Sequence, residues 1–328
     1  MAEISEIKRV AELFFSAEAI DSVTEVKGRV IVALKDIPED KVAAENLKRE
    51  LLQLEGISKA SVVFTAVKND ENDHYWKIRG VKKIVAVASG KGGVGKSTTA
   101  VNIALALKRL GQKVAIFDAD IYGPSVPTML NYEGATPLSK DGQTFEPFEV
   151  MGVQTMSIGT LVDRNTPLIW RGPKACGALQ QLLSDVNWYD VDVMVIDMPP
   201  GTGDIQITLS QQVHIDGAVI VSTPQDIALI DAIKGVNMFK AVNVPILGIV
   251  ENMSYHVCEK CGHKEYIFGE HGAEDTAVKI GVDFLGAIPL NIKIRSQADV
   301  GTPIVESEPE SEFAKAYLNI AAKIIKKL

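Results

Sequence analysis

Cysteine is scarce in this chain, and its scarcity limits both the fold and the compartment. The 328 residues contain three cysteines, too few for the disulfide framework that stabilises small secreted domains. Two of the three stand close together, at Cys258 and Cys261. The cysteine content therefore favours a reducing, cytoplasmic compartment.

Long apolar runs and an excess of positive charge are also absent. No run approaches the ~20 apolar residues that a membrane-spanning helix needs, and the N-terminus, with Glu3 and Glu6, has no apolar signal core. The formal net charge of −8 argues against non-specific nucleic-acid binding. Apolar residues make up 46% and charged residues 23%, the balance of an ordinary soluble globular protein.

The length suffices for two domains, and the pattern changes after the first sixty-odd residues. Residues 1–67 predict a small α+β domain, residues 68–80 are polar and predict a linker, and residues 81–328 predict the main domain. The elements expected in the small domain are a helix, a strand, a helix and a strand, in chain order Ile4–Phe15, Arg29–Leu34, Pro38–Leu54 and Ser61–Thr65.

From residue 81 on, short apolar runs alternate with helical segments. Such a succession indicates an α/β fold, in which a mostly parallel sheet is covered by helices on both faces. Functional sites in these sheets lie beyond the carboxyl ends of the strands. The runs expected to be strands are Lys83–Ser89, Val114–Phe117, Val193–Ile196, Ala218–Val221 and Ile246–Val250.

The first of these strands leads into the most informative motif of the chain, a phosphate-binding loop. Residues 90–98 fit G-x-x-x-x-G-K-[S/T], and an Ala- and Leu-rich helix follows and stops at Gly111. Glycines let successive N–H groups point at an anion, Lys96 can reach the outer phosphates, and Ser97 can ligate Mg²⁺. Strand, loop and helix in this order predict a P-loop NTPase. The residues expected to bind nucleotide here are Gly90, Lys91, Gly92, Gly93, Val94, Gly95, Lys96, Ser97 and Thr98.

Aspartates follow two of the predicted strands. Asp118 and Asp120 come after one, and Asp197 after another. An aspartate at such a point can hold the Mg²⁺ shell or orient a water, although aspartates also cap turns and helices there. We favour the functional interpretation, most strongly for Asp197. Residues 199–203 combine prolines with glycines and predict a switch segment.

The second informative motif is Cys258-x-x-Cys261. Two thiolates at this spacing can bind one metal centre, but such centres usually have four ligands. A second chain could contribute its own pair around an iron–sulfur cluster or Zn²⁺. His256 and His263 could instead complete a zinc site, which the spacing disfavours, or the pair could be a redox dithiol, which usually begins a helix. Cys176 is most simply a small buried residue.

Taken together, the motifs resemble those of a known group of ATPases. Residues 90–98, with the additional lysine Lys91, resemble the deviant phosphate loop of the nitrogenase iron protein and of the Min and Par positioning ATPases. Residues 81–328 more narrowly resemble the Mrp/Nbp35 (ApbC-type) iron–sulfur cluster carriers. Five stretches carry this second resemblance: Asp118–Ser125, Arg171–Pro173, Asp197–Asp204, Glu251–Ser254 and the pair Cys258 and Cys261.

The resemblance implies roles for particular residues in nucleotide chemistry. In that family Lys91 would act across a homodimer on the nucleotide of the partner. Asp120 would position the attacking water, and Asp197 would serve the Mg²⁺ shell together with the phosphate loop. Asn252 would contact the adenine base of ATP, helped by the loop Pro289–Arg295.

The resemblance also implies the activity. Cys258 and Cys261 of two subunits would hold a [4Fe-4S] cluster, and a slow ATPase would be coupled to its transfer to apo iron–sulfur proteins. Residues 1–67 resemble, more weakly, the MIP18-like domain often fused to such carriers. That domain has no cysteine before its long helix, which leaves it docking or dimer support as a role.

Two other functions compete with cluster transfer. In a zinc-stapled scaffold ATPase, the cysteine pairs would only hold a dimer together. In a membrane-associated positioning ATPase of the MinD/ParA type, an amphipathic C-terminal helix would lie on an anionic membrane, although such helices more often pack on the sheet. The apolar stripe of that predicted helix consists of Phe313, Tyr317, Ile320, Ile324 and Leu328.

Overall fold

The computed structural model describes residues 4–26, 28–34, 40–64, 75–76, 78–161, 172–258 and 260–328. The chain divides into two compact units, Met1–His74 and Tyr75–Leu328. Most of the linker expected over residues 68–80 lies outside the described residues, and the limits 1–67 and 81–328 stay a prediction. The backbone N–H of Trp76 donates to the carbonyl oxygen of Gln212 at 2.6 Å, so the described end of that segment belongs to the larger unit.

The smaller unit is a three-stranded sheet with two helices packed on one face. Its strand order is β1-β2-β3, with β1 and β2 antiparallel and β2 and β3 parallel. Val30, Val32 and Leu34 alternate along β2 into a core shared with both helices. The elements are α1 (Ile4–Ala11), β1 (Ile20–Val26), β2 (Arg29–Leu34), α2 (Lys41–Leu51) and β3 (Lys59–Phe64).

The second helix of this unit is shorter than the sequence pattern suggested. We expected it to begin at Pro38, but α2 begins at Lys41. The cause is a cap, because the Asp40 carboxylate accepts hydrogen bonds from the backbone N–H groups of Val42 and Ala43, both at 3.0 Å. Such a side chain satisfies donors that have no partner within the helix and sets its first turn.

The unit also contains a strand that the sequence analysis did not predict. Four of the seven residues of β1 are polar, so its pattern is weak, and it lies at the edge of the sheet. The first helix ends at Ala11 rather than at Phe15. The residues that follow it form turns, and Phe15 still packs into the core.

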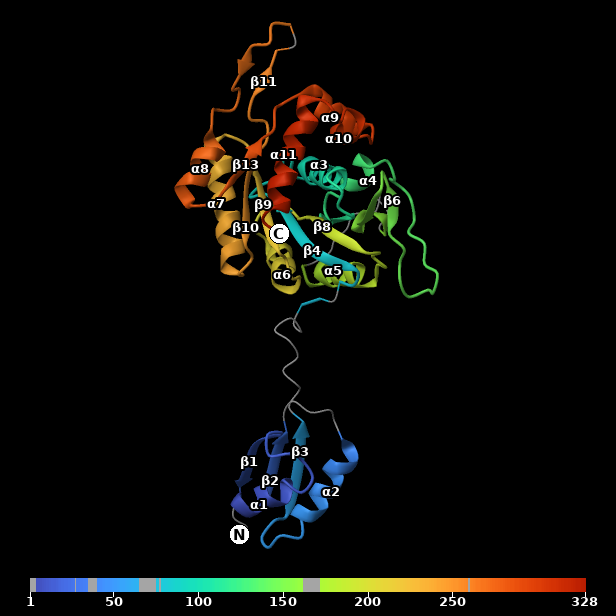
Figure 1. The fold of residues 1–328 in the computed structure, drawn as a ribbon, viewed down its shortest axis with the longest axis vertical. Helices are drawn as coiled ribbons and strands as arrows, with labels where there is room; N and C mark the ends of the chain where they lie inside the picture. The colour runs from blue at the N-terminus through green and yellow to red at the C-terminus, as the bar shows by residue number, and fades with distance from the viewer. Residues whose placement is uncertain are drawn as a thin grey trace. The chain divides into compact units, whose positions relative to one another are not determined.

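The larger unit is built on an eight-stranded sheet (Figure 1). The strand order is β13-β10-β9-β4-β8-β5-β7-β6, and all neighbours are parallel except β6 and β7. This confirms the mostly parallel α/β sheet expected from the sequence. In chain order the strands are β4 (Val81–Ala88), β5 (Val114–Asp118), β6 (Phe148–Val150), β7 (Val153–Ser157), β8 (Val191–Asp197), β9 (Gly217–Ser222), β10 (Ile246–Glu251) and β13 (Phe284–Ala287).

Helices cover both faces of this sheet, because side chains of the buried strands alternate between two cores (Figure 1). On one face lie α3 (Lys96–Arg109), α4 (Val126–Met129), α9 (Ile292–Asp299), α10 (Ile304–Ser307) and α11 (Glu312–Ile325). On the other lie α5 (Gly172–Asp185), α6 (Asp204–Gln212), α7 (Asp226–Ala241) and α8 (Gly272–Ile280). The remaining elements are the single turn η1 (Ile158–Thr160) and a hairpin of β11 (His256–Val257) and β12 (Lys264–Glu265).

The C-terminal helix packs as a core element. The apolar stripe of α11 faces α3 and the sheet, with Phe313, Tyr317, Ile320 and Ile324 buried and Leu328 packed at the edge of the same core. A stripe used in this way cannot also lie on a membrane surface, so the helix does not favour the membrane-associated alternative. In the described part of the chain, no helix is long and apolar enough to cross a bilayer.

The parallel strands bring the predicted motifs together. Because β4, β5, β8, β9 and β10 run in the same direction, their carboxyl ends meet at one edge of the sheet, here named the carboxyl edge. The phosphate loop follows β4, the aspartates follow β5 and β8, and the segment with Asn252 follows β10. The motifs therefore meet at the edge of the sheet where the α/β pattern placed them.

Candidate functional site

The phosphate loop joins the central strand β4 to α3. Gly93 and Gly95 have positive φ values of 82° and 79°, a conformation that L side chains rarely adopt. At Gly95 the lack of a side chain also leaves room, since a Cβ there would lie 2.1 Å from Nδ2 of Asn252. The loop thus ends in a left-handed residue just before the first turn of α3, whose free N–H groups form an anion site.

A buried ion pair ties the loop lysine to the strand aspartate. Nζ of Lys96 lies 2.6 Å from Oδ1 of Asp197, with side chains 6% and 0% exposed, and it also donates to the Ser97 hydroxyl at 3.2 Å. Burial raises the pKa of Asp197, and the Lys96 ammonium opposes that shift. Two residues 101 positions apart are thereby fixed at one point of the carboxyl edge.

The same point offers the oxygen ligands that Mg²⁺ prefers. The second carboxylate oxygen of Asp197, Oδ2, is buried and accepts no hydrogen bond from any described residue. A buried acceptor without a partner is costly unless a cation or water satisfies it. The Ser97 hydroxyl is beside the same ammonium, so the two predicted ligands, Ser97 and Asp197, fit a Mg²⁺ ion.

Asp118 organises the loop that carries Asp120. Its carboxylate accepts from the N–H of Asp120 at 3.1 Å, the N–H of Val126 at 3.2 Å and the hydroxyl of Ser157 at 3.0 Å. Burial, followed by the nearby carboxylate of Asp197, raises the pKa of Asp118 to about 7. Asp118 is therefore a buried anchor, and Ser157 on β7 is a supporting residue that the sequence analysis missed.

Asp120 itself is buried at the carboxyl edge. The residue is 9% exposed, and one oxygen of its carboxylate accepts from the N–H of Gly123 at 3.2 Å. The preceding residue is fixed to the neighbouring strand, since the N–H of Ala119 donates to the carbonyl oxygen of Asp197 at 2.9 Å. Asp120 and Asp197 are thus brought together, close enough that the Asp120 carboxylate adds to the rise in the pKa of Asp197.

The segment predicted as a switch is bound to the phosphate-loop strand. The N–H of Met198 donates to Val87 at 3.0 Å, and the N–H of Gly201 donates to Ser89 at 2.9 Å. Gly201 has a φ of 89°, which permits the sharp turn before α6 begins at Asp204. A change at the phosphates would therefore reach this segment through main-chain bonds.

The additional lysine of the loop is placed differently from Lys96. Lys91 is half-buried, and its backbone carbonyl accepts a hydrogen bond from the Ser89 hydroxyl at 2.8 Å. Among the described residues, none forms an ion pair with the Lys91 ammonium. The fold thus holds the backbone of Lys91 and leaves its charge unpaired within this part of the chain.

Asn252 lies against the phosphate loop and lines a small pocket. Its Nδ2 donates to the carbonyl oxygen of Val94 at 2.8 Å, and it is 7% exposed. The pocket has a volume of about 160 Å³ and includes much of the segment expected to help Asn252. Its walls are formed by Gly95, Thr98, Met129, Asn252, Met253, Pro289, Leu290, Asn291, Ile294, Arg295, Ala298 and Asp299.

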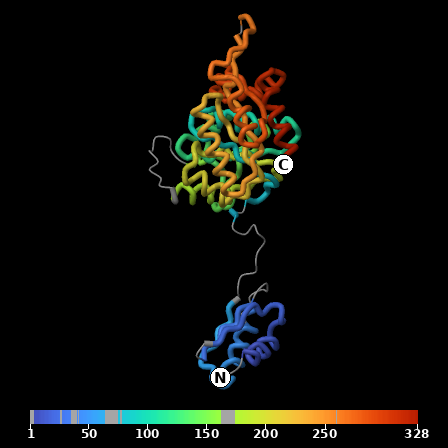
Figure 2. Tube along the Cα trace, turned by 90° about the vertical axis from the view of Figure 1, so that its left-hand side faces the viewer, coloured from blue at the N-terminus to red at the C-terminus, as the bar shows by residue number. Residues whose placement is uncertain are grey.

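The cysteine pair stands on the hairpin of β11 and β12, which projects from the larger unit in both views (Figure 1, Figure 2). The N–H of Cys258 donates to His263 at 2.9 Å and the N–H of Gly262 donates to Cys258 at 2.8 Å, closing a tight turn. Backbone N–H groups of Cys261 and Lys260 lower the pKa of Cys258. Cys258 is half-buried and Cys261 exposed, so both thiols lie at the surface of the hairpin.

The described residues do not complete a metal site within one chain. No group of three or more His, Cys, Asp and Glu side chains among them is placed to hold a metal ion. His256 is occupied at the base of the hairpin, where its Nδ1 donates to the carbonyl oxygen of Leu290 at 3.2 Å. The zinc site in which His256 and His263 would complete the pair therefore has no support in this fold.

The third cysteine and one further motif lie elsewhere. Cys176 is on α5, half-buried against the core, in line with its interpretation as a packing residue. Arg171 lies outside the described residues, and residues 172–173 begin α5.

Sequence reasoning named Glu251 only as part of the stretch Glu251–Ser254 and missed its role in fixing the turn around Asn252. Glu251 ends β10 and is 1% exposed. Its carboxylate accepts from the Ser254 hydroxyl and, at 2.6 Å, from the N–H of Ala273 at the start of α8. The signal was an acidic residue at the end of a buried strand, the same signal that drew attention to Asp197.

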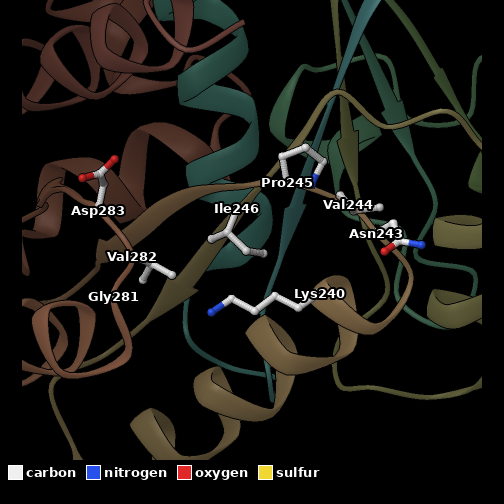
Figure 3. A pocket seen from close by; sticks show the side chains of 8 residues that line it. All are labelled: Lys240, Asn243, Val244, Pro245, Ile246, Gly281, Val282 and Asp283. Atoms are coloured by element: carbon white, nitrogen blue, oxygen red, sulfur yellow. The ribbon is translucent and has the colours of Figure 1, made fainter.

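A separate pocket of about 510 Å³ lies at the opposite edge of the sheet (Figure 3). It is lined by the residues between α7 and β10 and by those just before β13, which precede the strands rather than follow them. Since the phosphate loop follows the carboxyl end of β4, this pocket is not part of the candidate site. Its lining residues are Lys240, Asn243, Val244, Pro245, Ile246, Gly281, Val282 and Asp283.

Comparisons with known proteins agree with this geometry. The family described as ParA: NUBPL iron-transfer P-loop NTPase matches residues 80–325. The iron-sulfur cluster carrier protein of Escherichia coli (strain K12) is 52% identical over 291 residues, covering 87% of this chain and 78% of that protein. A nucleotide-binding protein from Archaeoglobus fulgidus, solved in complex with ADP, has a TM-score of 0.64 at 36% identity and covers 73% of this chain and 93% of its own.

The fold has a second kind of relative. The cell division ATPase MinD of Pyrococcus furiosus aligns with a TM-score of 0.58 at 25% identity, over 75% of this chain and 99% of its own. The family match includes the phosphate loop, the aspartates that follow β5 and β8, and both cysteines of the hairpin. The chain therefore belongs to the ParA/NUBPL family of iron-transfer P-loop NTPases.

Proposed function

We propose that this protein is an ATP-hydrolysing carrier that holds a [4Fe-4S] cluster between two copies of the chain and transfers it to apo iron–sulfur proteins in the cytoplasm. The observation that carries the proposal is the position of the thiol pair. Cys258 follows Asn252 by six residues, so one connection after β10 lines the small pocket beside Asn252 and then presents the thiols. We name this pocket the base pocket, because the adenine base would bind there. Two relatives support the proposal. One is named an iron-sulfur cluster carrier protein, which supports cluster transfer, and the other was solved with ADP, which supports nucleotide binding.

The phosphate loop and the aspartates supply what hydrolysis of ATP needs. N–H groups of the loop and the Lys96 ammonium would hold the phosphates. Asp120 would orient a water toward the γ-phosphorus, whose new bond to that oxygen replaces its bond to the bridging oxygen of ADP. The products are ADP, inorganic phosphate and a proton. Lys91, with its charge unpaired in the described residues, is suited to reach the nucleotide of a second copy.

Ser97 and Asp197 would hold the Mg²⁺ ion, which would neutralise charge on the phosphates. A phosphate entering the loop would compete with Asp197 for Lys96, whose ammonium lies 2.6 Å from that carboxylate. Asp197 would then exchange the Lys96 ammonium for the Mg²⁺ ion. Because Met198 follows it directly and is bonded to β4, the exchange would act on the switch segment.

The hairpin of β11 and β12 carries the thiols of Cys258 and Cys261 and is here named the thiol hairpin. Its two thiols support a shared cluster. Each chain contributes two thiolates, whereas a [4Fe-4S] cluster takes four. Backbone N–H groups stabilise the Cys258 thiolate, the form that binds iron. The exposed position of Cys261 leaves the cluster open to a recipient, which suits a cargo that must leave.

Anaerobic reconstitution with iron and sulfide tests the proposal. Wild type should retain iron and acid-labile sulfide, absorb in the visible range and have the mass of a dimer. Cys258→Ala and Cys261→Ala should lose the cluster and still bind ATP, and Cys176→Ala is the matched control that should behave as wild type. A colourless wild type, or loss of cluster in the control alone, would contradict the assignment.

The same preparation distinguishes an iron–sulfur cluster from zinc. The distinction is needed because two thiolates at this spacing could bind either metal. Zinc near one per dimer with no iron, in protein purified without oxygen, would favour the zinc-stapled scaffold. Transfer is then measured directly, by activation of an apo protein that requires a [4Fe-4S] cluster, with and without ATP.

A further inference from the structure

A single buried carboxylate binds both arms of the thiol hairpin at its base. Glu251 ends β10 and is 1% exposed. Its Oε1 accepts a hydrogen bond from the hydroxyl of Ser254, on the arm that leads into the hairpin. Its Oε2 accepts at 2.6 Å from the backbone N–H of Ala273, where the arm that leaves the hairpin enters α8 (Figure 1). Cys258 and Cys261 lie on the stretch of chain between these two bonds, so the carboxylate closes that stretch at its base.

The backbone of Glu251 is fixed by the sheet. It pairs with Ser222 of β9 on one side and with Ala287 of β13 on the other, and its carbonyl oxygen accepts from the N–H of Ile288 at 2.8 Å. The carboxylate therefore projects from a rigid element. The next residue, Asn252, is bonded to the phosphate loop, so the thiol hairpin and the candidate nucleotide site share this support.

The start of α8 depends on the same carboxylate. Its N-cap residue, His271, has a φ of 57°, and its side chain caps none of the N–H groups of the described first turn. Glu251 supplies an acceptor from outside the helix, where a negative charge also suits the positive end of the helix dipole. A Cβ on Gly272 would lie 2.4 Å from the carbonyl oxygen of Pro224, so the outgoing arm has little room to shift at this point.

We infer that Glu251 is a positioning residue for the thiol pair, an inference that rests on the proposed function. By bonding to both arms, it sets where the hairpin leaves the sheet and hence the direction in which Cys258 and Cys261 face a cluster. A pair held in one orientation loses less conformational entropy when it binds than a mobile pair does. If Glu251 only capped α8, its loss would lower stability as the loss of any helix cap does, without a particular effect on the cluster.

Three variants of the full-length chain test the inference. Ser254→Ala removes the bond to the incoming arm and leaves the cap of α8, whereas Glu251→Ala removes both bonds. Glu251→Gln should restore them, since its amide oxygen can accept from Ala273 and its amide N–H can donate to the Ser254 hydroxyl. Ser311→Ala is the matched control, because the Ser311 hydroxyl caps α11 by accepting from the N–H of Ala314 at 3.1 Å.

Hydrogen exchange and cluster release follow these variants. In metal-free protein, the amides of residues 254 and 290, which bond the incoming arm to the segment after β13, should exchange about tenfold faster in Ser254→Ala, and the amide of Ala273 should join them in Glu251→Ala. Under nitrogen, an iron chelator should remove the cluster about tenfold faster from both variants. Glu251→Gln should behave as wild type does, and Ser311→Ala should lower the unfolding temperature without faster release.

Exchange and release in Ser254→Ala and Glu251→Ala as slow as in wild type would overturn the inference and leave the proposed function standing. Equally fast release from Ser311→Ala would also overturn it, because general stability would then explain the effect. So would fast release from Glu251→Gln, because the hydrogen bonds alone would not position the thiols. If Glu251→Ala does not fold, Ser254→Ala decides alone. A wild type that retains no cluster would contradict the proposed function, and the amide exchange would still decide whether Glu251 holds the hairpin.

Discussion

At the scale of single residues, the ion pair of Lys96 and Asp197 has two roles that can be separated. It satisfies a buried carboxylate in the folded chain, and it places an ammonium where phosphates would bind. Removing one partner of a buried pair leaves an uncompensated charge. A single substitution therefore affects stability and nucleotide binding together, and a second substitution is needed to separate them.

Lys96→Ala should weaken ATP binding by about tenfold to a hundredfold, because hydrogen bonds to charged groups contribute about 1.5–3 kcal/mol. The single variant should also unfold at lower temperature. The double variant Lys96→Ala/Asp197→Asn, in which the buried side chain is neutral, should recover thermal stability and not affinity. Calorimetric titration with a non-hydrolysable analogue and thermal unfolding measure the two effects. Affinity restored in the double variant would refute a direct contact between Lys96 and phosphate.

The thiol of Cys258 makes a prediction about pH. Backbone N–H groups of Cys261 and Lys260 lower its pKa by stabilising the thiolate, so the thiolate should persist to lower pH in the folded chain than in the unfolded one. Alkylation of Cys258 by iodoacetamide in reduced, metal-free protein should therefore reach half its maximal rate below pH ~8.5, the value for an ordinary cysteine. Peptide mass spectrometry follows the reaction.

Cys261→Ala is the informative variant for this pH profile, because alanine at 261 keeps the backbone N–H that is the main cause of the shift. Most of the difference between folded and denatured protein should survive in it. Identical midpoints in folded and denatured wild type would mean that these N–H groups do not act on the thiolate.

At the scale of elements, the thiol hairpin and the base pocket share one set of hydrogen bonds. The N–H of Leu290 donates to the carbonyl oxygen of Tyr255 at 2.7 Å, and Nδ1 of His256 donates to the carbonyl oxygen of Leu290 at 3.2 Å. Leu290 also lines the base pocket. A shift of the segment around Leu290 on binding a base would therefore move the base of the hairpin directly.

His256→Ala should weaken binding of ATP by about fivefold, because a hydrogen bond of this kind contributes about 1 kcal/mol. Binding of inorganic tripolyphosphate, which has no base, should be unchanged. His256→Asn offers an amide N–H near the position of Nδ1 and should bind ATP as wild type does. Competition titrations against a fluorescent nucleotide measure all three. Equal loss for ATP and tripolyphosphate would place the effect at the phosphate loop instead.

Elements with a long apolar pattern could be predicted from the sequence, whereas short or polar elements could not. The long apolar pattern of α3 and the buried runs of β4 and β8 were recognisable, since both faces of the sheet are covered. The strand β7 was not recognised, because Gln154, Thr155 and Ser157 interrupt its apolar pattern. The short strand β13 was missed because four residues that include Gly286 carry too weak a signal.

For the site, the sequence predicted which residues meet but not how they are held. The positions of the motifs after strands sufficed to bring Lys96, Asp120 and Asp197 to one edge. The bond from Asn252 to the carbonyl of Val94 joins residues 158 positions apart and depends on the packing of β10 beside β9 and β4. No local pattern carries such a pairing, and the anchoring role of Glu251 was missed for the same reason.

At the scale of the whole molecule, both parts of the proposed chemistry are incomplete in one chain. The thiol pair supplies half of the ligands that a cluster needs, and Lys91 has no ion pair among the described residues. In a dimer with two-fold symmetry, each copy would supply a lysine to the other and a pair of thiolates to a shared cluster. Formation of the dimer would then control hydrolysis and cluster binding together, which is the coupling that a carrier requires.

Mixing two inactive variants decides whether Lys91 acts on the partner. Lys91→Ala and Asp120→Asn should each bind ATP nearly as wild type does and hydrolyse it slowly, because each site then lacks one group that acts in hydrolysis. In a mixed dimer, the chain with Lys91→Ala keeps its own Asp120 and receives an intact Lys91 from the other copy. One complete site is restored if the lysine acts across the dimer, whereas both sites stay defective if it acts within its own chain. Phosphate release from the mixture should therefore exceed that of either variant alone. A mixture no faster than its components would place Lys91 in its own active site.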